Sequence, residues 1–185
     1  WSSDVCSSDL VEVIFHEGAC ADTMNYDGRY MMHNNFEGTK NLFHYCQERR
    51  IPFIYASSAS TYGHGKKGFT ETPACEEALN PYAYSKLFFD QYLRRFEGQL
   101  QSQVVGLRYF NVFGRSQNPD GMYAAVIPKF LKQLLHDEVP TINGDGRQSR
   151  DFTYIDNVIE ANLKACLASS EAAGEAYNIG SGGRE

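Results

Sequence analysis

Apolar residues along the chain alternate between short continuous runs and longer stretches with helical spacing. The runs at 11–15, 51–56 and 104–110 are mostly apolar, as expected for strands that are covered on both faces. Between them, apolar residues recur with helical periodicity and predict helices at about 32–50 and 81–96. Strands that alternate with helices indicate crossover connections and a parallel sheet. We therefore expect an α/β fold in which ligands bind beyond the carboxyl ends of the strands.

The pattern changes after Gly114. A polar loop rich in proline and glycine occupies 116–122, and a helix is predicted at 123–136. A second helix at about 155–167 and a short strand at 176–179 follow. We therefore divide the chain into two regions, residues 11–114 and residues 115–185.

The first ten residues, Trp1 to Leu10, differ from the rest of the chain. Four serines and two aspartates surround Cys6, without the basic start or the apolar centre of a signal peptide. We interpret residues 1–10 as a non-native leader and leave them out of the fold prediction.

Composition excludes several classes of function. The net charge of −6 and the scattered basic residues argue against a nucleic-acid partner, and no apolar run approaches the length of a membrane span. The five cysteines form no Cys-x-x-Cys pair, which is typical of reduced thiols in a cytosolic protein. The histidines lack metal-ligand spacing, so we predict no metal site.

The start of the helix at 81–96 is the first candidate for chemistry. Asn80 suits the N-cap and Pro81 the first helical position, which places Tyr82 and Lys86 on one helical face. An ammonium near a phenol lowers its pKa towards neutrality, so that tyrosine can accept a proton from a substrate hydroxyl. The alternative is an ordinary amphipathic helix with a solvated lysine.

Two further polar residues have two interpretations each. Ser58, at the end of the second apolar run, either satisfies backbone groups or hydrogen-bonds the substrate oxygen that the tyrosine deprotonates. It lacks the Gly-x-Ser-x-Gly elbow of a hydrolase. Arg150 forms either an ion pair with Asp151 or a fork that binds a diphosphate.

Several segments occur together in the order of one known family. They are His16-Glu17-Gly18-Ala19, Asn34-Asn35, Tyr55-Ala56-Ser57-Ser58-Ala59-Ser60-Thr61-Tyr62-Gly63, Pro81-Tyr82-Ala83-Tyr84-Ser85-Lys86, Leu107-Arg108-Tyr109-Phe110-Asn111-Val112-Phe113-Gly114 and Ser149-Arg150-Asp151-Phe152. The chain resembles the extended short-chain dehydrogenases/reductases that act as nucleotide-sugar epimerases and dehydratases.

The resemblance implies a role for each candidate residue. Tyr82 would be the catalytic base, Lys86 would lower its pKa and hold the nicotinamide ribose, and Ser58 would complete the catalytic set. The residues implied to face NAD or NADP are Gly18, Ala19, Asn35, Tyr82, Lys86 and the backbone near Phe110. The residues implied to contact a nucleotide-diphosphate sugar are Ser58, Asn111 and Arg150.

The two halves of the chain resemble different members of the family. Residues 11–114 are similar to ADP-glycero-manno-heptose 6-epimerases, and residues 115–185 are similar to UDP-N-acetylglucosamine or UDP-glucose 4-epimerases. The heptose enzymes resemble one another in having a lysine where this chain has Asp120. The sequence therefore predicts an NAD(P)-dependent epimerase and leaves the 4-epimerase and the 6-epimerase open.

Two alternatives stay beside the epimerase. A 4,6-dehydratase would need an acidic pair next to Ser58, where this chain has Ala59 and Ser60. The other is a non-catalytic remnant that binds nucleotide sugars, because the family's first strand and phosphate-binding glycine loop would precede Val11.

The predicted architecture is a Rossmann-like parallel sheet that lacks its first strands, with part of a small substrate-binding domain. We expect residues 11–114 to be a partial NAD(P)-binding domain and residues 115–185 a partial substrate-binding region. By resemblance, the complete parent is expected to be a cytoplasmic homo-oligomer.

Overall fold

The computed structural model describes residues 11–115, 117, 126–142 and 144–183. Its centre is a four-stranded sheet with the strand order β1-β2-β3-β6. These strands are β1 (Ile14–His16), β2 (Phe53–Ser58), β3 (Val104–Tyr109) and β6 (Ala176–Ile179). Every neighbouring pair is parallel, which confirms the predicted α/β fold with a parallel sheet.

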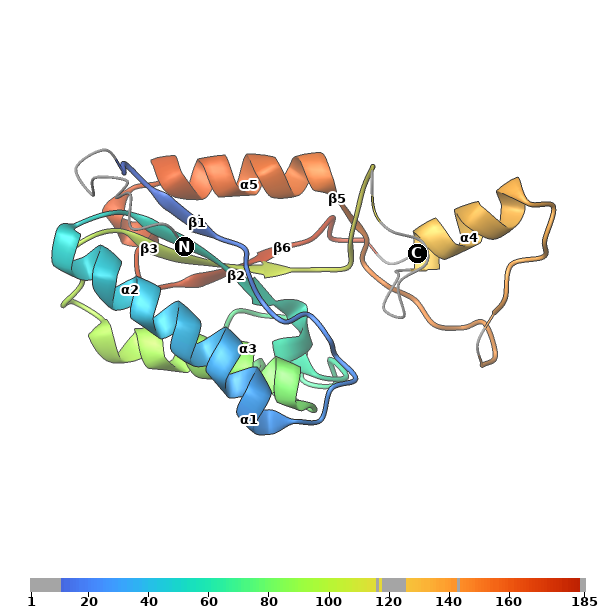
Figure 1. The fold of residues 1–185 in the computed structure, drawn as a ribbon, viewed down its shortest axis with the longest axis horizontal. Helices are drawn as coiled ribbons and strands as arrows, with labels where there is room; N and C mark the ends of the chain where they lie inside the picture. The colour runs from blue at the N-terminus through green and yellow to red at the C-terminus, as the bar shows by residue number, and fades with distance from the viewer. Residues whose placement is uncertain (1–10, 116, 118–125, 143, 184–185) are drawn as a thin grey trace, which may run out of the picture.

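Helices cover both faces of the sheet. The helical stretch that precedes β2 consists of α1 (Gly28–Met31), the π-helix η2 (Met32–Glu37) and α2 (Gly38–Arg49). This stretch and α3 (Pro81–Leu93) lie on one face, and α5 (Ile155–Leu167) lies on the other (Figure 1). Short 3₁₀ turns lie at Ala59–Tyr62, Pro73–Cys75, Arg94–Phe96 and Ser170–Ala172.

The alternation of side chains along each strand divides the core in two. Phe53 and Tyr55 of β2 belong to the cluster that packs against α2 and α3. Ile54, between them, belongs to the cluster that includes Ala165 of α5. Because successive strand residues point to opposite faces, a continuous apolar run is what a sheet between two helical layers requires.

The predicted start of α3 is confirmed. The Asn80 side chain accepts a hydrogen bond from the backbone N–H of Ala83 at 2.8 Å, and Pro81 is the first helical residue. The helix expected at 32–50 begins earlier than predicted, at Gly28, and contains the π-helical segment.

The residues after β3 contribute to the main sheet and its helical layers, and also to a second, smaller sheet. A two-stranded parallel sheet pairs β4 (Val112–Phe113) with β5 (Thr153–Tyr154), and α4 (Val126–Leu135) lies away from the layers (Figure 1). In contrast, β6 adds a strand to the main sheet by pairing with β3. The chain crosses from β3 to β6 through α5. The division at residue 114 therefore does not follow the layers. The substrate-binding role of residues 115–185 stays a prediction.

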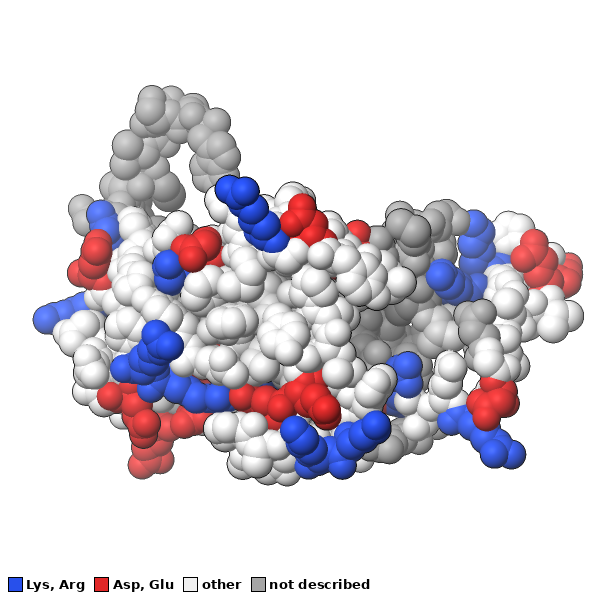
Figure 2. Space-filling view, turned by 90° about the horizontal axis from the view of Figure 1, so that it is seen from below, with Lys and Arg blue, Asp and Glu red and all other residues white. Residues whose placement is uncertain are grey.

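Charges of both signs are mixed on the face of the molecule that Figure 2 shows. There, Lys and Arg side chains lie among Asp and Glu side chains. Within the described residues, none of the helices combines the length and the apolar character that crossing a membrane requires.

Candidate active site

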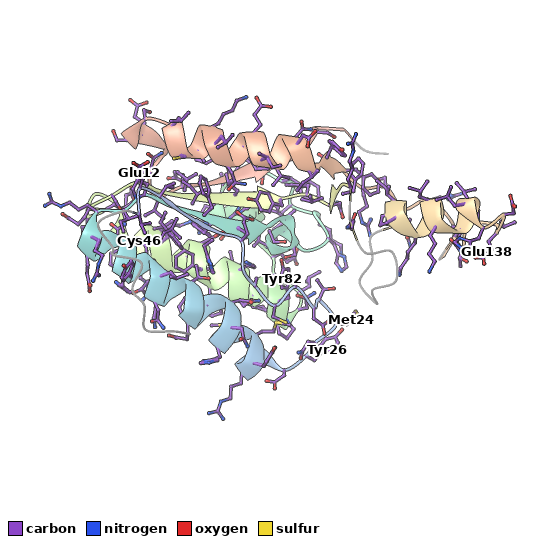
Figure 3. All side chains as sticks on the ribbon, turned by 45° about the horizontal axis from the view of Figure 1, so that its top comes forward. Glu12, Met24, Tyr26, Cys46, Tyr82 and Glu138 are labelled. Atoms are coloured by element: carbon purple, nitrogen blue, oxygen red, sulfur yellow. The ribbon has the colours of Figure 1, made fainter. Side chains whose placement is uncertain are left out.

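The predicted catalytic residues lie at the carboxyl end of the sheet. Ser58 is the last residue of β2, and Tyr82 is the second residue of α3. Figure 3 shows Tyr82 at the same end of the molecule as Met24 and Tyr26 of the loop after β1, whereas Glu12 and Cys46 lie towards the other end. Crossover connections start from this edge, so loops from different strands converge there.

A cavity of about 910 Å³ opens at this edge. Five of the predicted site residues line it: Ser58, Tyr82, Phe110, Asn111 and Arg150. These residues come from four loops or element ends that are distant in the sequence, and they line one cavity. Among the described residues, Gly18, Ala19, Asn35 and Lys86 do not line this cavity.

Ser58 and Tyr82 line the same cavity. Burial raises the pKa of the Tyr82 phenol, and the nearby Ser58 hydroxyl acts to lower it. Ser58 is itself held by Ser60, whose hydroxyl lies 2.9 Å from the Ser58 oxygen. A substrate hydroxyl in this cavity could therefore contact both the Ser58 hydroxyl and the Tyr82 phenol.

The pKa of Tyr82 shifts in the direction opposite to the one expected from sequence. Burial raises it above the ordinary value, and the nearby Ser58 hydroxyl only partly opposes this. The Lys86 Nζ donates to the backbone carbonyl of Ala56 at 2.7 Å. Burial is therefore the largest influence on the phenol here, and a lowering of its pKa by Lys86 stays a prediction.

Lys86 is itself strongly affected by its surroundings. Only 5% of the residue is exposed, and burial lowers its pKa to about 8. The carboxylates of Asp90 and Glu17 oppose that shift. A lysine with a pKa near the working pH is a feature of functional sites, although buried structural pairs produce it too.

Asn35 anchors the loop that follows β1. Its amide nitrogen donates to the Cys20 carbonyl at 3.0 Å and to the Ser85 hydroxyl at 3.0 Å, and its oxygen accepts from the Cys20 N–H at 2.8 Å. Asn35 is 1% exposed, whereas Gly18 and Ala19 of the same loop are exposed. The side chain of Asn35 thus serves protein contacts here, and its predicted contact with the cofactor stays a prediction.

Asp151 connects the loops around Asn111 and the end of β6. Its backbone carbonyl accepts the Asn111 amide at 2.8 Å. Its carboxylate accepts from the Ser181 N–H at 2.8 Å, the Ser181 hydroxyl at 2.7 Å and the Gly182 N–H at 3.0 Å. Of the two interpretations of Arg150, the ion pair is therefore not observed: Arg150 is exposed, and it donates to the Ser149 carbonyl at 2.9 Å.

A buried charge cluster behind the site was not found from sequence. Arg108 of β3 is 1% exposed and contacts Asp90 at 2.9 Å, Glu76 at 2.7 Å and the Tyr62 hydroxyl at 2.7 Å. The Tyr62 hydroxyl donates in turn to Asn178, which lines the cavity. The signal in the sequence is an arginine inside an apolar strand, because a buried charge needs partners.

Comparison with known proteins identifies the family. The sequence matches the NAD dependent epimerase/dehydratase family over residues 2–180. The chain belongs to this family. The match includes most of the segment interpreted as a non-native leader, and that interpretation stays a prediction.

Individual relatives cover nearly the whole chain. It is 50% identical over 178 residues to an ADP-L-glycero-D-manno-heptose-6-epimerase of Alkalilimnicola ehrlichii, covering 93% of this chain and 55% of that protein. A UDP-N-acetylglucosamine 4-epimerase from Methanobrevibacter ruminantium, solved in complex with UDP-N-acetylmuramic acid, superposes with a TM-score of 0.86 at 32% identity, over 94% of this chain and 56% of that one.

The ADP-L-glycero-D-manno-heptose-6-epimerase of Helicobacter pylori gives a TM-score of 0.82 at 32% identity, over 94% of this chain and 54% of that one. Both kinds of enzyme that the sequence resembles are thus among its relatives. The chain spans about half the length of the proteins that it matches.

Groups at the sheet edge are of the kind that suits the ribose part of the nicotinamide cofactor that the family description names, and their contact with it stays a prediction. Lys86 supplies an ammonium and Tyr82 a phenol on one helical face, and the exposed residues Gly18 and Ala19 follow β1. Ribose hydroxyls accept and donate hydrogen bonds, so such a set of donors suits them.

Proposed function

We propose that this chain carries the catalytic part of an NAD-dependent epimerase that acts on a nucleotide-diphosphate sugar. The single observation that carries the proposal is the joint position of Ser58 and Tyr82 in a cavity that Asn111 and Arg150 also line. Family membership supports the same reaction class.

Tyr82 is the proposed base. Its phenolate would accept the proton of the sugar hydroxyl as the carbon that bears it loses hydride, which leaves a keto sugar. Ser58 would donate a hydrogen bond to the same sugar oxygen and hold it in line. When bound, NAD⁺ supplies the hydride acceptor and a positively charged ring near the site.

Once the keto sugar presents its other face, its carbonyl carbon would take back the hydride while Tyr82 returns the proton to the sugar oxygen. The reaction inverts one carbon and leaves no net change in oxidation state. Lys86 would hold the ribose and contribute positive charge to the site. Such charge is needed to offset the burial that raises the pKa of Tyr82.

The substrate side of the cavity suits an anion. Arg150 is exposed at its rim, and its forked donors match a diphosphate. Asn111 also lines the cavity. Among sugar nucleotides, ADP-heptose is our first choice because a heptose epimerase relative is 50% identical over 93% of this chain. Asp120, which argued against 6-epimerization, lies outside the described residues.

The two alternatives receive less support. The Ser60 hydroxyl contacts Ser58 at the place where a 4,6-dehydratase would carry an acid. A protein that only bound nucleotide sugars would not need Ser58 and Tyr82 in the same cavity. We further propose a cytoplasmic location, consistent with the free thiols of Cys20, Cys46, Cys75 and Cys166, and a homo-oligomeric parent.

The proposal is tested with the protein expressed from its complete reading frame. ADP-heptose, UDP-N-acetylglucosamine and UDP-glucose are offered separately, the products are resolved by proton NMR, and bound NAD(H) is measured by absorbance. Tyr82→Phe should reduce turnover by about 10²- to 10⁴-fold while bound cofactor is retained.

Tyr84→Phe is the matched control. Tyr84 lies on the same helix but is 50% exposed, and its substitution should leave turnover unchanged. Near-normal turnover in Tyr82→Phe, or no epimerization of any of the three sugars by the unmodified protein, would refute the proposal.

A further inference from the structure

The carboxylate of Asp90 is buried against the strand that ends in Ser58. Asp90 is 2% exposed. One oxygen accepts the Tyr55 hydroxyl at 2.9 Å, and the other accepts the Ser57 hydroxyl at 2.9 Å and Arg108 Nε at 3.0 Å. Both oxygens are therefore engaged by β2 and β3.

Asp90 lies on the helix that carries Tyr82 and Lys86. The three residues are spaced four apart on α3, so they follow one face of the helix. Lys86 contacts the carbonyl of Ala56 at 2.7 Å. Three consecutive residues of β2, Tyr55 to Ser57, are thus joined to this face of α3, and the next residue is Ser58.

Burying the Asp90 carboxylate beside Ser57 costs free energy, and the stability of the core alone does not explain why it is there. Burial raises the pKa of Asp90, and Arg108 opposes that shift. Apolar side chains of similar volume often stabilise a core as well as a buried ion pair does. Buried polar groups that are fully hydrogen-bonded instead specify one arrangement of the elements that carry them.

We propose that Asp90 is a positioning residue of the site: by accepting the Ser57 hydroxyl, it fixes Ser58 of β2 relative to Tyr82 of α3. Asp90 does not line the cavity. It acts through the strand, and the effect on turnover rests on the proposed epimerase function.

Ser57→Ala tests this with no change of charge. It removes the Ser57–Asp90 hydrogen bond and leaves the ion pair of Asp90 with Arg108 in place. In the protein from the complete reading frame, kcat should fall about 10- to 100-fold, because small misplacements of a catalytic group have effects of this size. KM and the amount of bound NAD(H) should not change, and Ser57→Thr, which keeps the hydroxyl, should restore kcat.

A readout that does not need turnover separates this inference from the proposed function. The 185-residue chain is labelled with tyrosine ¹³Cζ, and the Tyr82 resonance is assigned by its loss in Tyr82→Phe. Its chemical shift reports the surroundings of the phenol, which include the Ser58 hydroxyl. Ser57→Ala should move this resonance, and Ser57→Thr should return it.

Ser102→Ala is the matched control. At the opposite end of the strands, it removes the hydrogen bond from the serine hydroxyl to the Ile51 carbonyl at 2.9 Å and the one that the hydroxyl accepts from Gln47 at 2.7 Å. This variant should leave both kcat and the Tyr82 resonance unchanged. If Ser57→Ala also leaves the Tyr82 resonance unchanged, the inference is overturned, whether or not the protein turns over a nucleotide sugar.

Discussion

The Lys86 ammonium donates a hydrogen bond to the carbonyl of Ala56, two residues before Ser58. The lysine thereby rests against the strand that carries the serine, while its helix carries the tyrosine. Burial of this ammonium lowers its pKa to about 8.

The first prediction uses that pKa. In the unfolded chain, a lysine titrates near 10.4, so between about pH 8 and pH 10 the unfolded state binds more protons than the folded state. Stability therefore rises with pH in this window. Relative to Lys86→Met, the unmodified chain should gain up to about 1.4 kcal/mol of unfolding free energy per pH unit.

Urea unfolding of both proteins at several pH values measures this difference. The charged groups that influence Lys86 are Asp90 and Glu17. The pKa of His16 is lowered by burial and, to a smaller extent, by Lys86. All three are retained in Lys86→Met. Parallel curves for the two proteins would contradict the prediction.

The second prediction concerns Arg108. Arg108→Met leaves the Asp90 carboxylate buried without its counter-ion, which should lower the unfolding free energy by about 3–5 kcal/mol. Urea unfolding of the chain measures it. Arg147→Met is the control: Arg147 is exposed and lies 4.0 Å from Asp145, so its loss should change stability by less than about 1 kcal/mol. Equal effects of the two substitutions would be incompatible with a buried cluster.

The third prediction concerns Gly180, after β6. A Cβ at this position would lie 2.6 Å from Oδ2 of Asp151. Gly180→Ala should therefore displace the Asp151 carboxylate from Ser181 and Gly182 and weaken nucleotide-sugar binding about tenfold, the effect of losing roughly one charged hydrogen bond. Calorimetric titration with UDP-N-acetylglucosamine or ADP-heptose measures the Kd. Gly28→Ala, outside the cavity and with nothing within 4 Å of the added Cβ, should bind normally.

The fourth prediction concerns Asn35. Asn35→Asp replaces its donor with a second acceptor, facing the Cys20 carbonyl and the Ser85 hydroxyl. The repulsion from Cys20 should cost about 1–3 kcal/mol of unfolding free energy and speed exchange of the Cys20 amide. Asn34→Asp changes the exposed neighbour in the same way and should cost less than about 0.5 kcal/mol. Hydrogen exchange followed by mass spectrometry would show whether the Cys20 loop is held as described.

Local signals predicted the elements that lie closest to the site. The start of α3 follows from Asn80 and Pro81, which act within a few residues, and α5 occupies the predicted range of 155–167. The cavity-lining position of Ser58, Tyr82 and Asn111 follows from the rule that loops after parallel strands meet at one edge.

The features that the sequence did not predict depend on how deeply side chains are buried and on partners that lie far away in the sequence. An acid within a helix, such as Asp90, is usually solvated, and its counter-ion Arg108 lies 18 residues away on a strand. The direction of the pKa shift of Tyr82 depends on how deeply α3 is buried, which helical spacing does not reveal. The same holds for the π-helical segment, whose apolar residues fit an ordinary helical pattern.

That segment, Met32–Glu37, makes the site depend on a count of residues as well as on their kinds. Each residue of an α-helix turns the chain by about 100°, so removing one residue here would rotate Gly28–Met31 by that angle relative to α2. The loop after β1 is attached both to this stretch and, through Asn35, to α3. A one-residue deletion would therefore turn the loop out of register with the catalytic helix even if every side chain that contacts it were kept.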